Sequence, residues 1–385
     1  MNLEILSILA FFGIIGAIII IDRKNIEFGL ILIRRTKKGE KKIKEFALKH
    51  KRFFNVFAVF SVIVGVLLSI VGFVYLFSGT GVRLILPKVF PGEVSEGVQE
   101  VVFFMPLWYW VIGLFIIIIP HELFHGFLFA LEKIKIKSVG FFLFLIFPGG
   151  FVEPDEEQFS NSKPFKRMKI SAVGSIANAC TYIILILLTL LWLYIGSLVF
   201  QEVGISFEGT IPDTPANEVG MEGVITEING KEVKNFENLS NIFEDISPGD
   251  TVNVVTTKGE YSFRTIESPE NPSQAFMGIE NLSTKLDYKP RFTFLGNPSG
   301  LIAIYTWVAD LLSWLGVITI SVAIANLLPF LPFDGGILWK SIFEKVTKNE
   351  NLSKKMILGL TIITYSLLIM SFVDVRSILG TLGLI

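Results

Sequence analysis

Long apolar runs separated by short charged segments form the main pattern of this chain. A helix needs ~20 apolar residues to cross the hydrocarbon core of a bilayer. Five runs meet that length and a sixth is just long enough: 3–21, 53–78, 107–131, 170–199 and 311–331, and then 356–373. The pattern therefore predicts a polytopic α-helical membrane protein with about six spans.

The first run, 3–21, has to be distinguished from a signal peptide. It has no basic residues before its apolar part and no small-x-small cleavage site, and charged residues follow it at once. A cleaved signal peptide carries both of the missing features. We therefore expect a retained span.

One segment, 201–290, has the pattern of a water-soluble domain. Apolar and polar residues alternate in short runs such as 223–228, and turn-forming pairs such as Asn229-Gly230 and Lys258-Gly259 separate the runs. A helix is expected between Asn235 and Ile246. This mixture predicts an inserted soluble α+β module.

The composition excludes a soluble protein. Hydrophobic residues make up 51% of the chain and charged residues 18%, whereas an ordinary soluble domain has about 25% charged residues. So apolar a chain is not disordered either. A single cysteine, Cys180, excludes an intrachain disulfide and a cysteine-based metal cluster. We expect the lipid bilayer as a partner and no nucleic acid.

Charge is distributed unevenly along the chain, and this orients the spans. Residues 22–52 carry twelve Lys and Arg against four acidic residues, whereas residues 201–290 carry six against sixteen. Short loops rich in Lys and Arg remain on the cytoplasmic side. The rule places 22–52 and the Lys-rich segments 132–169 and 337–355 inside, and 79–106 and 200–298 outside. We expect an integral protein of the cell membrane.

The third apolar run contains the motif His121-Glu122-Leu123-Phe124-His125. On a helix its two imidazoles lie one turn apart on one face, about 6 Å along the axis. This suits two zinc ligands, with the intervening glutamate close enough to polarise water. The alternative is a pair of core histidines, but ionisable groups inside a membrane are costly and usually functional. His50 lies in the basic loop, where we expect it to be solvated.

A catalytic zinc site needs a third protein ligand and keeps a fourth position open. Leu128 and Leu131 stand where metzincins have Gly and His, which excludes that class. Two carboxylate regions remain, one in the segment 153–157 that begins with Glu153 and the other at Asp334.

Depth in the membrane favours Asp334 over Glu153. His121 lies about 21 Å into its span, and Asn326 lies about 22 Å into a span of the same direction. Pro329 and Pro332 then break the helix, so that Asp334 can turn back toward the histidines. The other interpretation of this region is a Pro/Gly loop that leaves the membrane.

With these motifs the sequence resembles the site-2 protease family of intramembrane zinc metalloproteases. The resemblance rests on four matches in the family's order: His121–His125, Pro148–Val152, Gly174–Asn178 and Asn326–Gly336. The second is like the family's re-entrant hairpin, the third like its Gly-Pro-x-x-Asn, and the last like its Asn…Pro…Asp-Gly element. Ser175 stands where the family usually has Pro.

The resemblance implies one Zn²⁺ per chain, a general base, oxyanion donors and a strand that receives an unwound substrate. The residues that it assigns to these roles are His121, His125 and Asp334 for zinc, Glu122 as the base, Asn326 and Asn178 for the oxyanion, and Gly149, Gly150 and Phe151 in the hairpin 138–152. For Asn178 the alternative is a hydrogen bond between helices.

Segment 201–290 is similar to a PDZ domain of the bacterial membrane-protease type. Thr214-Pro215-Ala216, residues 222–230 and Met277-Gly278-Ile279 carry this match, with Glu222-Gly223 in place of the usual Gly-Asp. The similarity implies a domain that filters substrates outside the membrane.

The expected fold is therefore a polytopic helical membrane protein with a re-entrant hairpin and an inserted PDZ-like domain. Its expected domains are two N-terminal spans with a basic loop (1–105), the first part of the catalytic core (106–199), the PDZ-like domain (200–290), the second part of the core (291–345) and a C-terminal span (346–385).

Three classes of function compete for this sequence. The first is an intramembrane zinc metalloprotease that cuts transmembrane segments of membrane-bound regulatory or signal-type proteins. The second is a non-catalytic receptor or adaptor that contains structural zinc and binds protein tails with its PDZ-like domain. The third is a metal transporter, which should show inverted repeats of broken helices. The sequence shows no such repeats.

Overall fold

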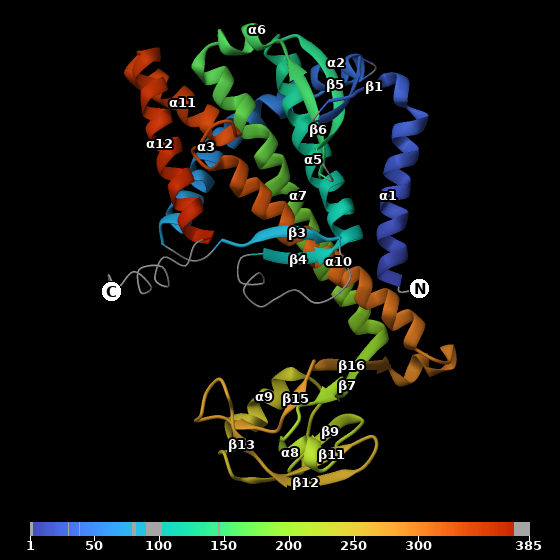
Figure 1. The fold of residues 1–385 in the computed structure, drawn as a ribbon. Coiled ribbons are helices and arrows are strands. Elements are labelled where there is room, and N and C mark those ends of the chain that lie inside the picture. Colours follow the sequence, from blue (N-terminus) through green and yellow to red (C-terminus); the bar gives the residue numbers. More distant parts are fainter. Residues whose placement is uncertain are drawn as a thin grey trace. The chain divides into compact units, whose positions relative to one another are not determined.

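The structure, a computed structural model, divides into two compact units, which consist of residues 1–188 with 311–385 and of residues 189–310 (Figure 1). It describes residues 3–29, 31–37, 39–78, 82–89, 102–144 and 147–372. Parts of three predicted segments lie outside the described residues: most of the outer loop 79–106, the hairpin tip at 145–146 and the chain after 372.

Within the described residues, five helices are long and apolar enough to cross a membrane. They are α3 (Lys51–Phe77), α5 (Leu107–Leu131), α7 (Pro164–Val199), α10 (Ser299–Leu327) and α12 (Glu350–Phe372). Helix α1 (Leu3–Ile21) is also apolar. The structure describes its side chains from Ile5 to Ile21, and this stretch is shorter than the five spanning helices. The predicted polytopic helical membrane protein is confirmed, and the count of six spans stays a prediction. Helices α7 and α10 begin before the predicted apolar runs, because hydropathy marks only the part of a helix that lies in hydrocarbon.

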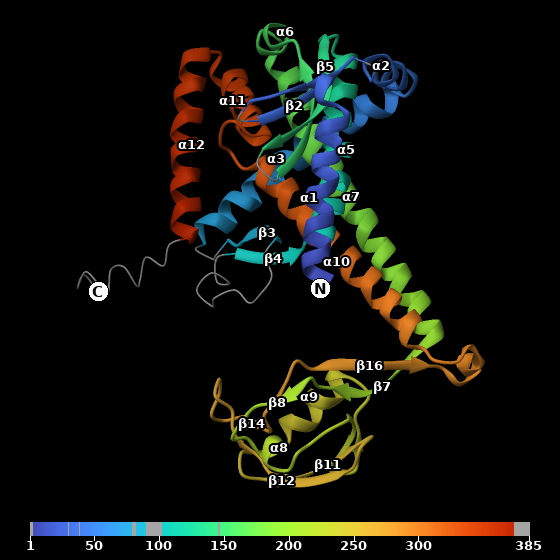
Figure 2. The same ribbon diagram turned by 45° about the vertical axis from the view of Figure 1, so that its right-hand side comes forward.

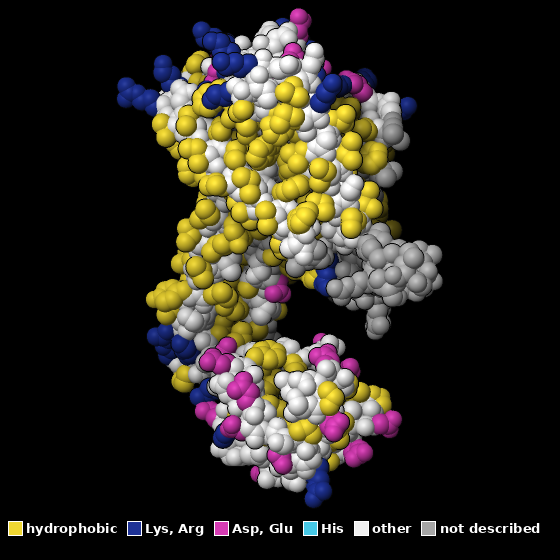
Figure 3. Space-filling model, turned by 90° about the vertical axis from the view of Figure 1, so that its left-hand side faces the viewer, with side chains coloured by type: hydrophobic (Ala, Val, Ile, Leu, Met, Phe, Trp, Pro, Cys, Tyr) yellow, Lys and Arg dark blue, Asp and Glu magenta, His cyan; other side chains and the backbone are white. Residues whose placement is uncertain are grey.

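The outer surface of the first unit suits a lipid environment. Apolar side chains cover much of its helices, whereas Lys and Arg gather at the end where α6 and α11 lie (Figure 3). On α3, for example, Val56, Ile63 and Leu67 expose 72%, 60% and 58% of their surface. Exposed apolar patches of this extent mark contact with a membrane or with another protein.

The predicted hairpin belongs to a larger sheet than the sequence indicated. Strands β5 (Ile136–Phe144) and β6 (Phe147–Pro154) pair antiparallel with Phe141 opposite Gly150. Strand β2 (Ile31–Thr36) pairs with β5 (Figure 2). Strand β1 (Ile26–Glu27) pairs with β2, so the order is β1-β2-β5-β6. The basic segment 22–52, expected only as a loop, thus supplies two strands. In the part of the chain that the structure describes, β6 has an unpaired outer edge.

Helix α2 (Glu40–Lys49) follows these strands and packs on α5 through aromatic rings. Phe46 contacts Phe127 with ring centroids 5.2 Å apart, and Phe54 on α3 lies 4.7 Å from the same ring. Such aromatic pairs stabilise by about 0.5–1.5 kcal/mol beyond the apolar area that they bury. They hold the N-terminal segment on the helix that carries the His-Glu-x-x-His motif.

The helical structure is interrupted between α10 and α11 (Asp334–Thr347), as Pro329 and Pro332 predicted. Helix α10 ends at Leu327, and α11 begins with Asp334 itself. Ser69 on α3 donates its hydroxyl hydrogen to the carbonyl of Leu327 and accepts from Trp339 Nε1 at 2.8 Å. These bonds satisfy a carbonyl that the end of the helix leaves without a partner. A Cβ at Gly335 would overlap the Leu327 backbone, so glycine permits the close turn.

The second unit contains strands and short helices over the segment 201–290, the α+β arrangement expected there. Its main sheet has the order β12-β11-β9-β7-β16, and β10 pairs with β9. The bounds of these strands are Phe200–Ser206 for β7, Val224–Ile228 for β9, Lys231–Glu232 for β10, Thr251–Thr256 for β11, Glu260–Arg264 for β12 and Ser283–Tyr288 for β16. The expected turns at 229–230 and 258–259 connect strands. The expected helix is α9 (Phe236–Glu244), which Asn235 caps through its side chain.

Short elements complete both units. The second unit also contains β8 (Gly209–Thr210), α8 (Pro215–Glu218), β13 (Ile266–Glu267), β14 (Ala275–Phe276), β15 (Ile279–Glu280) and η2 (Pro290–Leu295). The first contains η1 (Arg23–Asn25), the parallel strands β3 (Leu84–Lys88) and β4 (Val102–Pro106), and α6 (Glu156–Ser160).

Candidate metal centre

Three predicted ligand residues meet in the first unit. Helix α5 carries His121 and His125, and the first residue of α11 is Asp334. The two Nε2 atoms lie 3.1 Å apart, and each lies 3.2 Å from Asp334 Oδ2. The three side chains expose only 12%, 10% and 16% of their surface. The sequence therefore brings together a compact, largely buried set of two imidazoles and a carboxylate.

The spacing of these three donor atoms suits a zinc ion. Zinc binds imidazole nitrogen and carboxylate oxygen at about 2.0–2.2 Å in a tetrahedral arrangement, which separates neighbouring ligand atoms by about 3.3–3.6 Å. The observed separations of 3.1–3.2 Å are close to this. Within the described residues the group contains three such side chains and no fourth. The donor set thus fits a zinc site that keeps an open position.

Glu122 lies beside these donors and is held by the hairpin. Its Oε2 accepts a 2.9 Å hydrogen bond from the backbone N–H of Val152 on β6. The bond joins the carboxylate to the outer edge of the sheet, because Val152 directs this N–H away from β5. Glu122 also lines the cavity that contains the three donors.

Glu153, the competing ligand candidate, lies in a different environment. Its carboxylate accepts a hydrogen bond from Ser138 on β5 and lies 3.5 Å from Arg35 on β2. A hydrogen bond to Glu27, and then the charges of Glu27 and Glu153, raise the pKa of Arg35 above its ordinary value, so Arg35 stays cationic. The cationic partner of Glu153 is therefore an arginine from the N-terminal strands.

One face of α7 lies against the histidines. The backbone carbonyl of Ile170 lies 2.8 Å from His125 Nδ1, and Asn178 Nδ2 lies 3.3 Å from His121 Nδ1. Between them, a Cβ at Gly174 would overlap the His125 ring. Ser175 Oγ lies 3.5 Å from Asp334 Oδ2, at the limit of a hydrogen bond. The predicted Gly174–Asn178 motif therefore contacts all three donor residues.

A cavity of about 470 Å³ opens beside the three donors. It is lined by both histidines, Glu122, Asp334 and the half-buried Asn326. Gly150, Val152 and Pro154 line it from the edge of β6. This is the size of a typical ligand pocket, and its lining is mainly apolar with a few polar groups.

Three predicted site residues do not line this cavity. A Cβ at Gly149 would overlap the ring of Phe142, and Phe151 places its ring 5.9 Å from the guanidinium carbon of Arg35. Asn178 is completely buried. Of the three hairpin residues singled out, only Gly150 therefore reaches the cavity.

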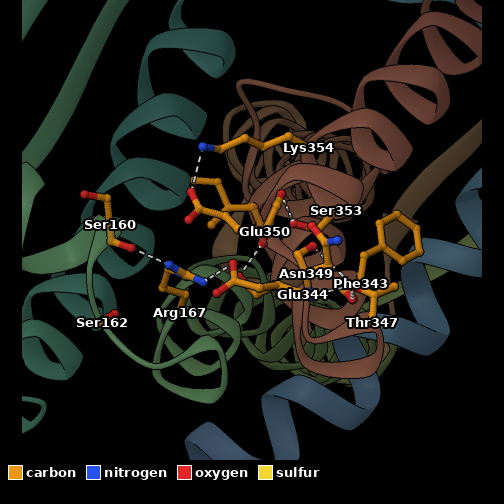
Figure 4. A network of polar contacts seen from close by, with 12 residues as sticks. Ser160, Ser162, Arg167, Phe343, Glu344, Thr347, Asn349, Glu350, Ser353 and Lys354 are labelled. Atoms are coloured by element: carbon orange, nitrogen blue, oxygen red, sulfur yellow. Dashed lines mark hydrogen bonds and ion pairs between the residues drawn. The ribbon is translucent and has the colours of Figure 1, made fainter.

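An ion pair fixes α11, the helix that carries Asp334, against α7. Arg167 donates to Glu344 and to the backbone carbonyl of Ser160, and Figure 4 shows both contacts. The side chains of Arg167 and Glu344 expose 10% and 20% of their surface. Close by, Lys354 pairs with Glu350 at 2.6 Å at the start of α12. The two contacts of Arg167 thus join α6, α7 and α11 at one end of the unit.

Sequence reasoning missed Ile170, Arg35 and Arg167 as parts of the site's support. Ile170 contributes a backbone carbonyl, which its residue type does not reveal. Arg35 reaches Glu153 because β2 pairs with β5, a strand that is distant in sequence. Arg167 had a visible signal, because a charged residue beside a membrane span is usually paired.

Comparison with known proteins agrees with this geometry. The model of Peptidase family M50 matches residues 109–371, which is more than half of the chain. An uncharacterized protein of Methanocaldococcus jannaschii, MJ0971, is 29% identical over 344 residues, which cover 85% of this chain and 82% of that protein. Proteases of family M50 are zinc-dependent enzymes of membranes. The chain therefore belongs to peptidase family M50, the site-2 protease family.

Proposed function

We propose that this protein is an intramembrane zinc metalloendopeptidase that hydrolyses peptide bonds in transmembrane segments of membrane-bound regulatory or signal-type proteins. The observation that carries the proposal is the convergence of His121, His125 and Asp334 beside Glu122 in a cavity bordered by an unpaired strand edge.

His121, His125 and Asp334 would hold one zinc ion per chain through Nε2, Nε2 and Oδ2. When bound, zinc acts as a Lewis acid toward water and the peptide carbonyl. The donor separations support this assignment, as does the absence of a fourth donor among the described residues. A catalytic zinc site keeps three protein ligands, whereas a structural one is closed by four.

Glu122 would be the general base. Its Oε2 is occupied by the Val152 N–H, which leaves Oε1 to take a proton from water and pass it to the leaving amine. The hydrogen bond fixes the orientation of the carboxylate before the substrate binds. No conformational entropy of the Glu122 side chain is then lost during the reaction. A positioned general base typically contributes ~10²–10⁴-fold to the rate.

Asn326 would stabilise the oxyanion that forms at the scissile carbonyl. It lies in the last turn of α10, lines the cavity and carries an uncharged amide donor. Such a donor in a site that excludes water stabilises developing negative charge, and removal of one typically costs ~2.7–4 kcal/mol.

Strand β6 would receive the substrate as an additional strand. Gly150, Val152 and Pro154 line the cavity, and they alternate along β6 with the residues that direct their backbone N–H and C=O groups toward β5. Pro154 has no N–H, and the N–H of Val152 is bonded to Glu122. The edge therefore offers the cavity one N–H donor, that of Gly150, so a short stretch of unwound substrate would dock there. A Cβ at position 150 would lie 2.5 Å from Ile118 Cγ2, so any residue larger than Gly150 would displace Ile118.

The charge pattern supports the proposed orientation. Lys and Arg gather at the end of the first unit that carries α6 and α11 (Figure 3), and that end would be cytoplasmic by the positive-inside rule. The site would lie near this side of the cell membrane. Residues 200–290, with a net charge of −10 over 201–290 from six basic and sixteen acidic residues, would form an extracytoplasmic PDZ-like domain.

The main alternative is a receptor or adaptor with structural zinc. The open donor set and a carboxylate base beside it disfavour this function, because neither serves a closed structural site. A metal transporter would not need the strand edge that borders the cavity.

Cleavage of a model transmembrane substrate by the purified protein, with and without a zinc chelator, tests the proposal. We expect cleavage that the chelator abolishes and added zinc restores. Glu122→Gln should cleave about 10²–10⁴-fold more slowly, and Glu156→Gln on the exposed α6 should match the wild type. Zinc that resists the chelator, together with tail binding and no cleavage, would instead support the receptor function.

A further inference from the structure

Three residues spaced four apart on α7, Ile170, Gly174 and Asn178, face the two histidines in different ways. Ile170 presents a backbone carbonyl to His125 Nδ1 at 2.8 Å, and Gly174 leaves room for the His125 ring. Asn178 presents its amide to His121 Nδ1 at 3.3 Å. Each histidine thus has its Nε2 directed at Asp334 and its Nδ1 directed at α7.

This arrangement requires hydrogen-bond acceptors on α7 when the site holds a cation. A neutral imidazole that binds a cation through Nε2 carries its proton on Nδ1, and a partner for that proton fixes the ring. For His125 the partner is the carbonyl of Ile170. For His121 the group in reach is the amide of Asn178, which has a donor at one end and an acceptor at the other.

The amide of Asn178 is bonded at one end only. Its Nδ2 faces His121, whereas Oδ1 is buried and has no partner among the described residues. The two ends of an amide are interchangeable in shape. The side chain can therefore turn over without losing another hydrogen bond, and Oδ1 then faces His121 Nδ1.

We infer that Asn178 is a positioning residue for the metal ligand His121. Its Oδ1 accepts the Nδ1 proton of His121 when the site holds zinc, and its Nδ2 donates to the bare Nδ1 otherwise. The inference rests on the proposed zinc site. It replaces the oxyanion role expected from sequence, because Asn178 is completely buried and does not line the cavity.

The test is the zinc affinity of full-length variants in one detergent, measured by competition with a chelator. Asn178→Leu keeps the volume but removes the acceptor, and we expect about 10–100-fold weaker zinc binding. Asn178→Asp keeps an acceptor at the same place and should bind zinc at least as tightly as the wild type. Thr319→Val is the control, because Thr319 is also completely buried and its hydroxyl also lacks a partner among the described residues. It should not change the affinity.

Two results would overturn the inference. If Asn178→Leu bound zinc within about twofold of the wild type, the amide would not position His121, whether or not cleavage was lost. If Asn178→Asp lost zinc as Asn178→Leu did, acceptance of the Nδ1 proton would not be its role. A wild-type protein without zinc affinity would contradict the proposed function itself, which is a separate outcome.

Discussion

Val152 donates its backbone N–H to Glu122 Oε2 across 2.9 Å, so the edge of strand β6 and the carboxylate of helix α5 are directly bonded. Any segment that pairs with β6 therefore meets the base at a fixed register. The same bond removes Val152 from the donors that the edge can offer.

Glu122→Gln should lower the rate of cleavage by about 10²–10⁴-fold and leave the zinc content unchanged. The amide oxygen of Gln still accepts the Val152 N–H, so the strand stays in place while proton transfer is lost. Turnover and zinc per polypeptide, measured on the same preparation, check both parts. Turnover close to that of the wild type would contradict the role of Glu122 as base.

Asp334→Ala and Glu153→Ala should differ in zinc content. Asp334 Oδ2 lies 3.2 Å from both histidines, whereas Glu153 is bonded to Ser138 and lies near Arg35. We expect Asp334→Ala to bind zinc at least about tenfold more weakly and to be inactive. Glu153→Ala should keep its zinc, and the opposite pattern would make Glu153 the ligand.

The α+β module can be removed by deletion, because the residues where the chain enters it and leaves it are neighbours in space. Phe200 pairs with Tyr288 across β7 and β16, and Lys289 N–H donates to the Val199 carbonyl at 3.0 Å. A short Gly/Ser linker in place of residues 201–287 therefore spans a small gap. The module has its own buried core, which includes Ile225 and Val252.

We expect this deletion to retain zinc and the hydrolysis of an unfolded model substrate. The ratio of rates for substrates with and without a large external domain should change by about tenfold or more, equivalent to about 1.4 kcal/mol of selectivity. Zinc titration and paired cleavage assays provide the measurement. An empty metal site in the deletion variant would show that the module supports the core, against the proposed filter.

Substrates with a single backbone ester should reveal the pairing with β6. Replacement of one substrate N–H by oxygen removes one hydrogen-bond donor, with a loss of about 1 kcal/mol or fivefold in rate. Gly150 and Val152 direct their backbone groups away from β5, so their carbonyls are the expected acceptors of substrate N–H groups. We therefore expect losses at alternate positions of the substrate, and equal rates along the whole series would contradict strand addition.

The sequence predicted the residues of the centre because each carries its chemistry in its side chain. His121 and His125 are recognisable by their spacing in an apolar run, and Asp334 follows from the depth of its span and from the two prolines. The helix break after Leu327 has the same origin, since proline removes a donor and clashes with the preceding turn.

The parts that sequence analysis missed depend on long-range pairing or on backbone groups. Strand β2 pairs with β5 from more than 100 residues away in sequence, and β1 pairs with β2. The basic charges of this segment concealed its strand pattern. The partner of Glu153 follows from that pairing. The support for His125 is the carbonyl of Ile170, a group that every residue type has.

The ion pair between Arg167 and Glu344 limits which pairs of residues related chains can carry at these two positions. Loss of one partner leaves a largely buried charge without compensation, which typically costs ~3–5 kcal/mol, whereas exchange of both for apolar residues is often neutral. Positions 167 and 344 are therefore expected to change together among related chains, as a charged pair or as an apolar pair. A relative with a charge at only one of them should carry a new partner nearby.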